Sequence, residues 1–354
     1  MARLFFDSFD AYDSAHRLYK WSGDNTPGNG SSIDIVSGIA GMTANCLRLT
    51  TGNVAGYTWR NLPSVTTIFT GSRHSFPLPP TAQYIILGLH NSGNQQILVG
   101  VDSAGSIKAW VGAGASSVPQ LGALLCQSAT AVVSSNISFH LGVSAVISNS
   151  ATGSVSLYVN NVLVASASSV VTSGDGVSAC NQIAAWAGLS GFTFYVDDVI
   201  VNDSTGSENN SRVVEQRVDL LIPVGNGLAN AWTKTGAATN WQAATSTTPN
   251  PDDDTSYVAA ATTSLVDSYT VTTPANIGTP TAVQWVAACR TDDGGSAQVT
   301  PVIGDGVTTA NGTAIPVPSS YQYLLEVFDK NPITGLAWTA ADMLTIQPGI
   351  NRTA

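Results

Sequence analysis

Apolar and polar residues alternate along most of this chain, and helical periodicity is scarce before residue 200. The clearest example is 191–203, where aromatic and β-branched residues occupy almost every position. Because a strand that is apolar on both faces belongs inside a sheet, we expect this segment to be central. The run that follows, 204–211, is rich in Ser, Asn and Gly and has too little apolar surface to pack. We therefore predict that 191–203 is the closing strand of a first β domain.

A regular succession of strands precedes this segment. The alternation predicts strands at 84–90, 96–102 and 107–111, joined by connections of only a few residues. Strands so close together in sequence pair with their neighbours in antiparallel fashion. The sequence thus predicts an antiparallel meander.

A hairpin is predicted further along. Strands at 137–147 and 153–160 are separated by a short polar turn, and Asn160 and Asn161 then lead into a strand at 162–165. Asparagine tolerates the positive φ angles that a two-residue hairpin turn requires. The first domain is therefore predicted to be all-β.

These segments, taken in order, resemble the laminin-G-like, concanavalin A-like sandwich family. The resemblance rests on 139–146, 153–164 and 194–201, with Asn161 where the family usually has glycine. An asparagine in the left-handed region can accommodate that difference. The resemblance covers about residues 1–205 and implies a jelly-roll sandwich, and a fold alone does not assign a function.

A second β domain is expected after residue 211. Its predicted strands are 212–223, 255–258, 267–271, 281–290, 297–303 and 321–328, with one helical turn at 339–343. The organisation predicted from the sequence is a concanavalin A-like sandwich over 1–211 and a second, smaller β-sandwich, serving assembly, over 212–354. The fold class is all-β.

The composition narrows the classes of partner. Charged residues make up 10 % of the 354 residues and the net charge is −10, without a cluster of Lys and Arg. Nucleic-acid binding needs clustered cations, so it is not expected. No apolar stretch approaches the length of a membrane span, and the first residues do not resemble a signal peptide. We expect a chain that is either cytosolic or reaches its destination by another route.

No catalytic motif stands out. The three glutamates, Glu208, Glu215 and Glu326, do not form the paired pattern of sandwich glycosidases. Asp197 and Asp198 are adjacent in a strand, so we expect them to point to opposite faces, one outward and one bonded to a neighbouring loop. The sequence has no nucleophile elbow and no metal-ligand spacing among its four histidines. These absences favour a protein that is not an enzyme.

Four cysteines and one acidic run were also considered. Cys46, Cys126, Cys180 and Cys289 lack metal-binding spacing and are expected to be buried thiols, with a Cys46–Cys180 bridge as the alternative. No cofactor is expected. Calcium at Asp252, Asp253 and Asp254 is the alternative to a solvated turn.

Four aromatic residues are candidates for stacking on sugar rings or for subunit interfaces. They are Tyr57, Trp59, Trp232 and Trp241. The alternative is that they fill cores, as most large aromatic side chains in β proteins do.

The order of segments over nearly the whole chain also resembles tailed-bacteriophage virion proteins. This resemblance rests on 194–203, on 225–227 with Trp232 and Trp241, and on 252–258 and 331–338. It implies a non-enzymatic structural protein of the virion, in the head, neck or tail, that binds itself and other virion proteins. The alternatives are a carbohydrate-binding adhesin or receptor-binding protein of the particle and, more remotely, a β-glucanase-like enzyme.

Overall fold

A computed structural model describes residues 2–25, 30–42, 44–52, 55–115, 118–188, 191–245, 250–274, 277–292 and 295–354. The chain forms two compact units, 1–218 and 219–354, called unit 1 and unit 2 below. Residues 212–218 belong to unit 1, although the sequence analysis assigned them to the second domain. The strand predicted at 212–223 does not form, because Val213 packs over Gly71 and the Val218 amide donates to Asp198.

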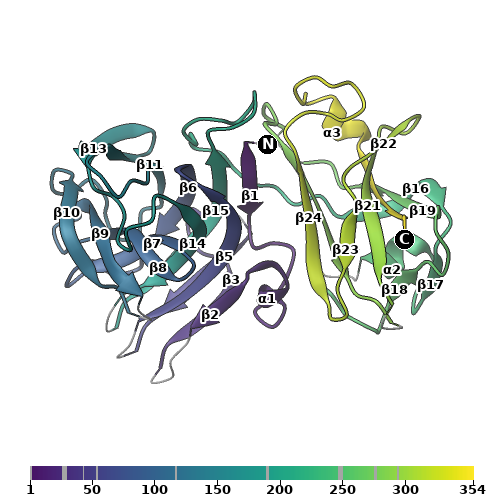
Figure 1. Ribbon diagram of the computed structural model, residues 1–354. Helices are drawn as coiled ribbons and strands as arrows, with labels where there is room; N and C mark the ends of the chain where they lie inside the picture. The colour runs from purple at the N-terminus through teal and green to yellow at the C-terminus, as the bar shows by residue number, and fades with distance from the viewer. Residues whose placement is uncertain are drawn as a thin grey trace. The chain divides into compact units, whose positions relative to one another are not determined.

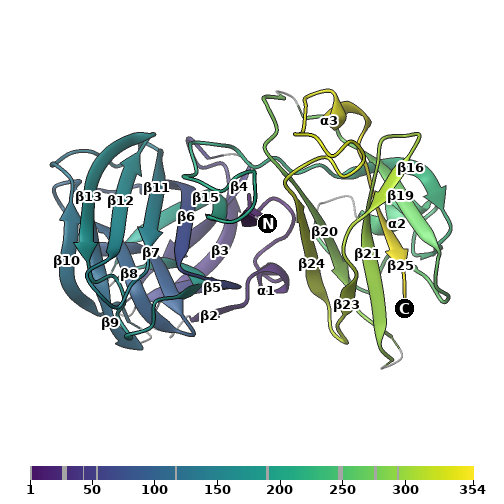
Figure 2. The same ribbon diagram turned by 45° about the horizontal axis from the view of Figure 1, so that its top comes forward.

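Unit 1 contains two sheets that pack face to face (Figures 1 and 2). The first, sheet A, has the order β13 (Val162–Val170), β12 (Gly153–Val159), β11 (Phe139–Val146), β6 (Thr67–Ser75), β15 (Thr193–Asp203), β4 (Asn45–Thr50) and β3 (Ser32–Ser37), with β1 (Arg3–Asp7) also paired to β15. The second, sheet B, has the order β10 (Leu121–Gln127), β9 (Ile107–Ala115), β8 (Asn94–Val101), β7 (Tyr84–Asn91), β14 (Cys180–Ala187), β5 (Gly56–Val65) and β2 (Gly23–Asn25). One helical turn, α1 (Arg17–Lys20), precedes β2.

The observed strands confirm the all-β sandwich. β15 is central in sheet A and has neighbours on both sides, as its apolar faces predict. The meander is formed by β7, β8 and β9, and the hairpin by β11, β12 and β13. Asn160 and Asn161 have φ angles of 48° and 69°, so asparagine performs the turn without glycine.

The prediction for Asp197 and Asp198 is partly wrong, because neither side chain is exposed to solvent. Both residues are at most 1 % exposed. Pairing with β6 shifts between Asp197 and Ile200, and Asp198 has a φ angle of 51°, so a β-bulge interrupts the alternation. The Asp198 carboxylate accepts hydrogen bonds from the Val218 amide and from Arg73, which is the predicted bond to a neighbouring loop.

A buried ion pair lies where β1 meets α1. The Lys20 ammonium donates to Asp7 Oδ1 at 2.8 Å, and both side chains are almost fully buried. Trp21 Nε1 donates to Asp7 Oδ2 at 2.8 Å, and the Tyr12 hydroxyl donates to the same oxygen. The Phe9 amide completes the set around the carboxylate. These donors converge on one carboxylate, and Trp21 Nε1 also donates to the Tyr12 hydroxyl at 3.0 Å.

Unit 2 is a smaller β-sandwich, as predicted. Its main sheet has the order β16 (Pro223–Asn230), β19 (Val266–Val271), β25 (Gln347–Arg352), β21 (Ala297–Gly304) and β22 (Thr309–Asn311), with β23 (Ile315–Val317) paired to β21. Two pairs complete it: β20 (Val283–Cys289) with β24 (Gln322–Phe328), and β17 (Thr233–Thr235) with β18 (Tyr257–Ala259). The helices are α2 (Asn240–Ala244) and α3 (Asp342–Thr345), the latter close to the predicted turn.

The core of unit 2 lies between the β20–β24 pair and strands β21 and β25 of the main sheet, with α3 beside them. Trp285, Ile303, Leu324, Trp338 and Met343 belong to one buried cluster. Within the described residues of both units, each helix is too short and too polar to cross a membrane.

All four cysteines are free, which rules out the bridge between Cys46 and Cys180. Burial raises the pKa of the thiols of Cys46, Cys180 and Cys289 to about 12. These thiols are therefore protonated at neutral pH. Cys46 and Cys180 are buried, as predicted, whereas Cys289 is partly buried.

Three buried histidines should make the folded protein less stable in mild acid. Burial lowers the pKa of His74 to about 3 and the pKa values of His90 and His140 to about 4. In the unfolded chain each would titrate near pH 6.5, so between about pH 6 and 4 only the unfolded state binds these protons. The free energy of unfolding should then fall by up to ~1.4 kcal/mol per histidine for each pH unit.

Denaturant unfolding at pH 7 and pH 5 measures this effect. The variant His90→Gln, whose amide oxygen can still accept the Trp186 N–H bond, should remove about one third of the pH dependence. Burial raises the pKa values of Asp10 and Asp198. The folded state therefore binds these two protons more readily than the unfolded state, so these groups favour folding as the pH falls. Equal stability at the two pH values would contradict the assignment of neutral buried histidines.

Candidate functional site

An aromatic cluster covers the outward face of sheet B. In β5, Tyr57 and Trp59 are two positions apart and therefore point to the same side. Their register partners in β14 are Trp186 and Ala184, and Ala184 in turn lies opposite Gly88 of β7. The alternate residues of β14, Ile183 and Ala185, line the space between the two sheets, so this aromatic side faces away from the sandwich core.

The Tyr57 ring contacts both tryptophan rings. Tyr57 stacks on Trp186 with 4.0 Å between ring centroids and 15° between planes. Tyr57 and Trp59 lie 5.4 Å apart with a tilt of 36°. Trp186 is fully buried, whereas Tyr57 and Trp59 are half-buried and form the outer layer of the cluster. We call Tyr57, Trp59 and Trp186 the aromatic platform.

Two glycines allow the indole rings to lie close to the sheet. A Cβ atom added at Gly23 would come within 2.2 Å of the Trp59 ring. A Cβ atom at Gly88 would come within 2.6 Å of Trp186 Nε1 and 2.4 Å of His90 Nε2. The rings therefore occupy space that any other residue would fill with its own side chain. This close approach holds the platform in place.

Neutral polar groups border the platform. Asn25, the register partner of Tyr57, hydrogen-bonds to its hydroxyl, while burial raises the pKa of Tyr57. On the other side of Trp59, Gln182 donates to Asn61 Oδ1 at 2.8 Å, and both amides have solvent access. Trp186 Nε1 donates to His90 Nε2 at 3.2 Å, and burial keeps His90 neutral by lowering its pKa to about 4.

The structure places the other two predicted aromatic residues elsewhere. Trp232 lies in unit 2, where it packs against the core cluster and donates through Nε1 to the Leu265 carbonyl. Trp241 lies in α2, where its backbone amide donates to Asn226. Only Tyr57 and Trp59 of the four candidates come together, and Trp232 serves the core.

The acidic run is held by hydrogen bonds within unit 2. Asp252 accepts from the amide and hydroxyl of Ser256, and Asp254 accepts from Arg290 and from the Tyr321 hydroxyl. Among the described residues, no group of three or more metal-binding side chains lies close enough to share an ion. The arrangement is that of a solvated, hydrogen-bonded turn.

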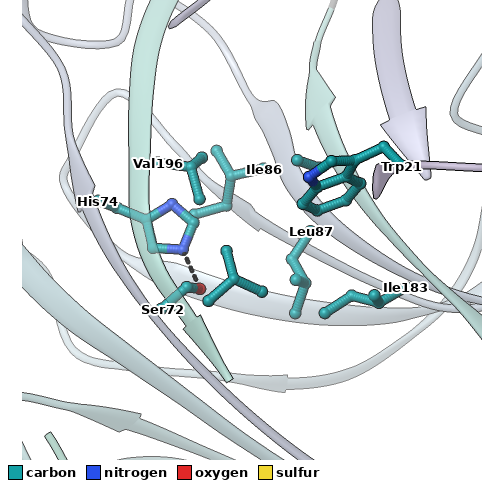
Figure 3. Close-up of a pocket in the computed structure, with 9 residues that line it drawn as sticks. Trp21, Ser72, His74, Ile86, Leu87, Ile183 and Val196 are labelled. Carbon is teal, nitrogen blue, oxygen red and sulfur yellow. Dashed lines mark hydrogen bonds between the residues drawn. The ribbon is translucent and has the colours of Figure 1, made fainter. Parts of the chain in front are cut away.

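A small cavity inside unit 1 is not a second candidate. It lies between the sheets and encloses about 10 Å³, at the lower limit for one water molecule. Figure 3 shows its polar side, where Ser72 Oγ and His74 Nε2 lie 2.7 Å apart, while the other labelled side chains are apolar except for the indole nitrogen of Trp21. A sugar ring cannot enter it.

Trp186 is the member of the platform that the sequence analysis missed. It lies in the apolar run 183–187, which reads as a buried strand, and its contact with Tyr57 depends on the pairing of two strands far apart in the chain. The strand-like pattern of residues around Tyr57 and Trp59 identified the other two members of the platform.

No protein-family model and no curated protein matches the sequence. Several solved structures are similar in fold. An endo-β-1,4-glucuronan lyase from Trichoderma reesei is 13 % identical, with a TM-score of 0.40, over 56 % of this chain and 94 % of the lyase. The cellulose induced protein Cip1 is 11 % identical, with a TM-score of 0.44, over 60 % of this chain and all of that protein. A carbohydrate esterase from the Shiga toxin-encoding bacteriophage phi24B is 12 % identical, with a TM-score of 0.38, over 56 % and 99 %.

These similarities correct two sequence predictions. We expected a structural protein of a virion and a chain that is not an enzyme, and both predictions are wrong. The similar structures include lyases, sialidases and a carbohydrate esterase from a phage. At 10–13 % identity, what this chain shares with them is the β-sandwich fold.

Proposed function

We propose that this protein binds carbohydrate on the outward face of sheet B, at the aromatic platform. The observation that carries the proposal is the pair of half-buried rings, Tyr57 and Trp59, supported from beneath by the buried Trp186. The apolar faces of sugar rings stack on such side chains, while their hydroxyl groups need neutral donors and acceptors nearby.

The surroundings of the platform supply these groups. The amides of Asn25, Asn61 and Gln182 lie on the same face as the rings, because each occupies a register position beside them. An amide can both donate to and accept from a hydroxyl group. Rings held by close contact with the sheet lose little conformational freedom when a ligand binds, which favours affinity.

Self-association and a location on a phage particle stay predictions from the sequence, and the proposed site requires neither. The proposal is compatible with chemistry on the bound carbohydrate, because proteins of similar fold include a lyase and an esterase.

Removing the indole of Trp59 should abolish most of the binding. We expect Trp59→Ala to weaken the association constant for a polysaccharide ligand roughly 10- to 100-fold, about 1.4 to 2.8 kcal/mol, because one stacking surface is lost. Affinity electrophoresis in gels that contain a panel of soluble polysaccharides measures the change. Trp241→Ala is the matched control, since it removes a half-buried indole from unit 2.

The control should migrate like the unsubstituted protein in every gel. Binding that survives in Trp59→Ala and is lost in Trp241→Ala would move the site to unit 2. No retardation in any gel would overturn carbohydrate binding. In parallel, reducing-end release and the ultraviolet absorbance of the double bond made by β-elimination report whether bound chains are cleaved.

A further inference from the structure

We infer that the carbohydrate bound at the platform is an uncharged polysaccharide and not a polymer of uronic acids. This inference rests on the proposed function and adds to it the substrate class. Its basis is the charge of the face that would contact the ligand.

The groups that border the rings are neutral. Tyr57 has a raised pKa and keeps its proton, His90 is uncharged, and the remaining polar groups are the amides of Asn25, Asn61 and Gln182. Carboxylates along a uronate chain would have to give up water here without gaining a cation in return, which is unfavourable.

Two arginines next to β2 and within β5 are directed elsewhere. Arg60 follows Trp59 but, as the next residue in the strand, points to the opposite side, where it donates to the Lys20 carbonyl and lies over the Phe5 ring. Arg17 is paired with Asp24. Neither guanidinium is placed to bind a carboxylate on the outward face.

One lysine does share the outward face. Lys108 is two positions from Trp110, which lies opposite Leu98 of the same apolar cluster. Its ammonium is 2.9 Å from Asp102 Oδ2, and both side chains are mostly buried. The pair is neutral in sum, and the Lys108 hydrogen bond lowers the pKa of Asp102, so the carboxylate stays charged at neutral pH. Within the described part of sheet B, the face thus offers no net positive charge.

The charge of the whole chain also disfavours a negatively charged polysaccharide. A net charge of −10 repels a polyanion at low salt, before any contact is made. An uncharged chain meets no such barrier, and its binding should not depend on ionic strength.

Two sets of gels at low and high salt test the inference. One set contains uncharged polysaccharides (a β-1,4-glucan derivative, a β-1,3-glucan, a galactomannan, a xylan), and the other contains alginate or polygalacturonate. We expect retardation by at least one uncharged polymer, equal at both salt concentrations and lost in Trp59→Ala, and less than a tenth of that affinity for either polyuronate.

The outcomes separate the two proposals. Retardation by alginate or polygalacturonate that weakens with salt and is lost in Trp59→Ala would overturn the substrate class and leave the site intact. Retardation by neither set would overturn both. Retardation by an uncharged polymer that Trp59→Ala does not affect, while Trp241→Ala does, would retain the substrate class but assign it to another face.

Discussion

Replacing Asp7 with asparagine should lower the free energy of unfolding of unit 1 by about 3 to 5 kcal/mol. The substitution keeps the shape of the side chain and removes its charge. Lys20 then remains buried as an unpaired ammonium, and the asparagine NH₂ group faces donors of Trp21 and Tyr12 that it cannot accept from. For a unit of this size the melting temperature should fall by roughly 6 to 20 °C.

The control for this variant is Asp34→Asn. Asp34 forms an ion pair with Arg48 at 2.8 Å, but both side chains are about one third exposed. Water screens such a pair, and its loss should cost less than about 1 kcal/mol. Calorimetry of the two variants beside the unsubstituted protein measures the difference. Equal effects of the two substitutions would show that burial adds nothing to the Asp7–Lys20 pair.

Replacing Trp186 with alanine should have the second large effect, on stability and binding together. A fully buried indole would be lost, at a cost of about 3 to 5 kcal/mol for the cavity that remains. Tyr57 would lose the ring on which it stacks at 4.0 Å, so the outer layer of the platform would lose its support. We expect a melting temperature lower by roughly 6 to 20 °C and polysaccharide affinity reduced at least tenfold.

Trp186→Phe separates packing from hydrogen bonding. Phenylalanine keeps a ring beneath Tyr57 and removes only the N–H group that donates to His90. It should therefore keep most of the affinity while costing about 1 to 3 kcal/mol of stability, because the buried His90 nitrogen loses its partner. Full loss of binding in Trp186→Phe, with wild-type stability, would contradict the supporting role of the ring.

The sequence predicted those parts of the fold that depend on local patterns. Alternation located the meander and the hairpin, and two adjacent asparagines located the turn between β12 and β13. The failures come from long-range contacts. The strand predicted at 212–223 is the example: Val213 packs on Gly71 of sheet A, and the Val218 amide donates to Asp198 at the β-bulge.

Only part of the candidate site, Tyr57 and Trp59, could be predicted from the sequence. Tyr57 and Trp59 alternate within one strand, so the sequence alone places them on one face. Trp186 joins them through pairing between β5 and β14, and nothing near either segment in the sequence indicates that register. Trp232 lies in a Thr- and Ala-rich segment that resembles an exposed loop, yet it packs against the core of unit 2. Composition of a segment does not distinguish a ring that faces solvent from one that faces a core.

The two glycines beneath the indoles limit how this surface can change over evolutionary time. A single methyl group at position 23 or 88 would overlap the Trp59 ring or the Trp186 and His90 nitrogens that now fill that volume. Mutational drift toward alanine, usually the mildest exchange for glycine, would therefore tilt an indole away from the sheet. A substitution at either glycine should therefore disturb the platform, although neither residue belongs to it.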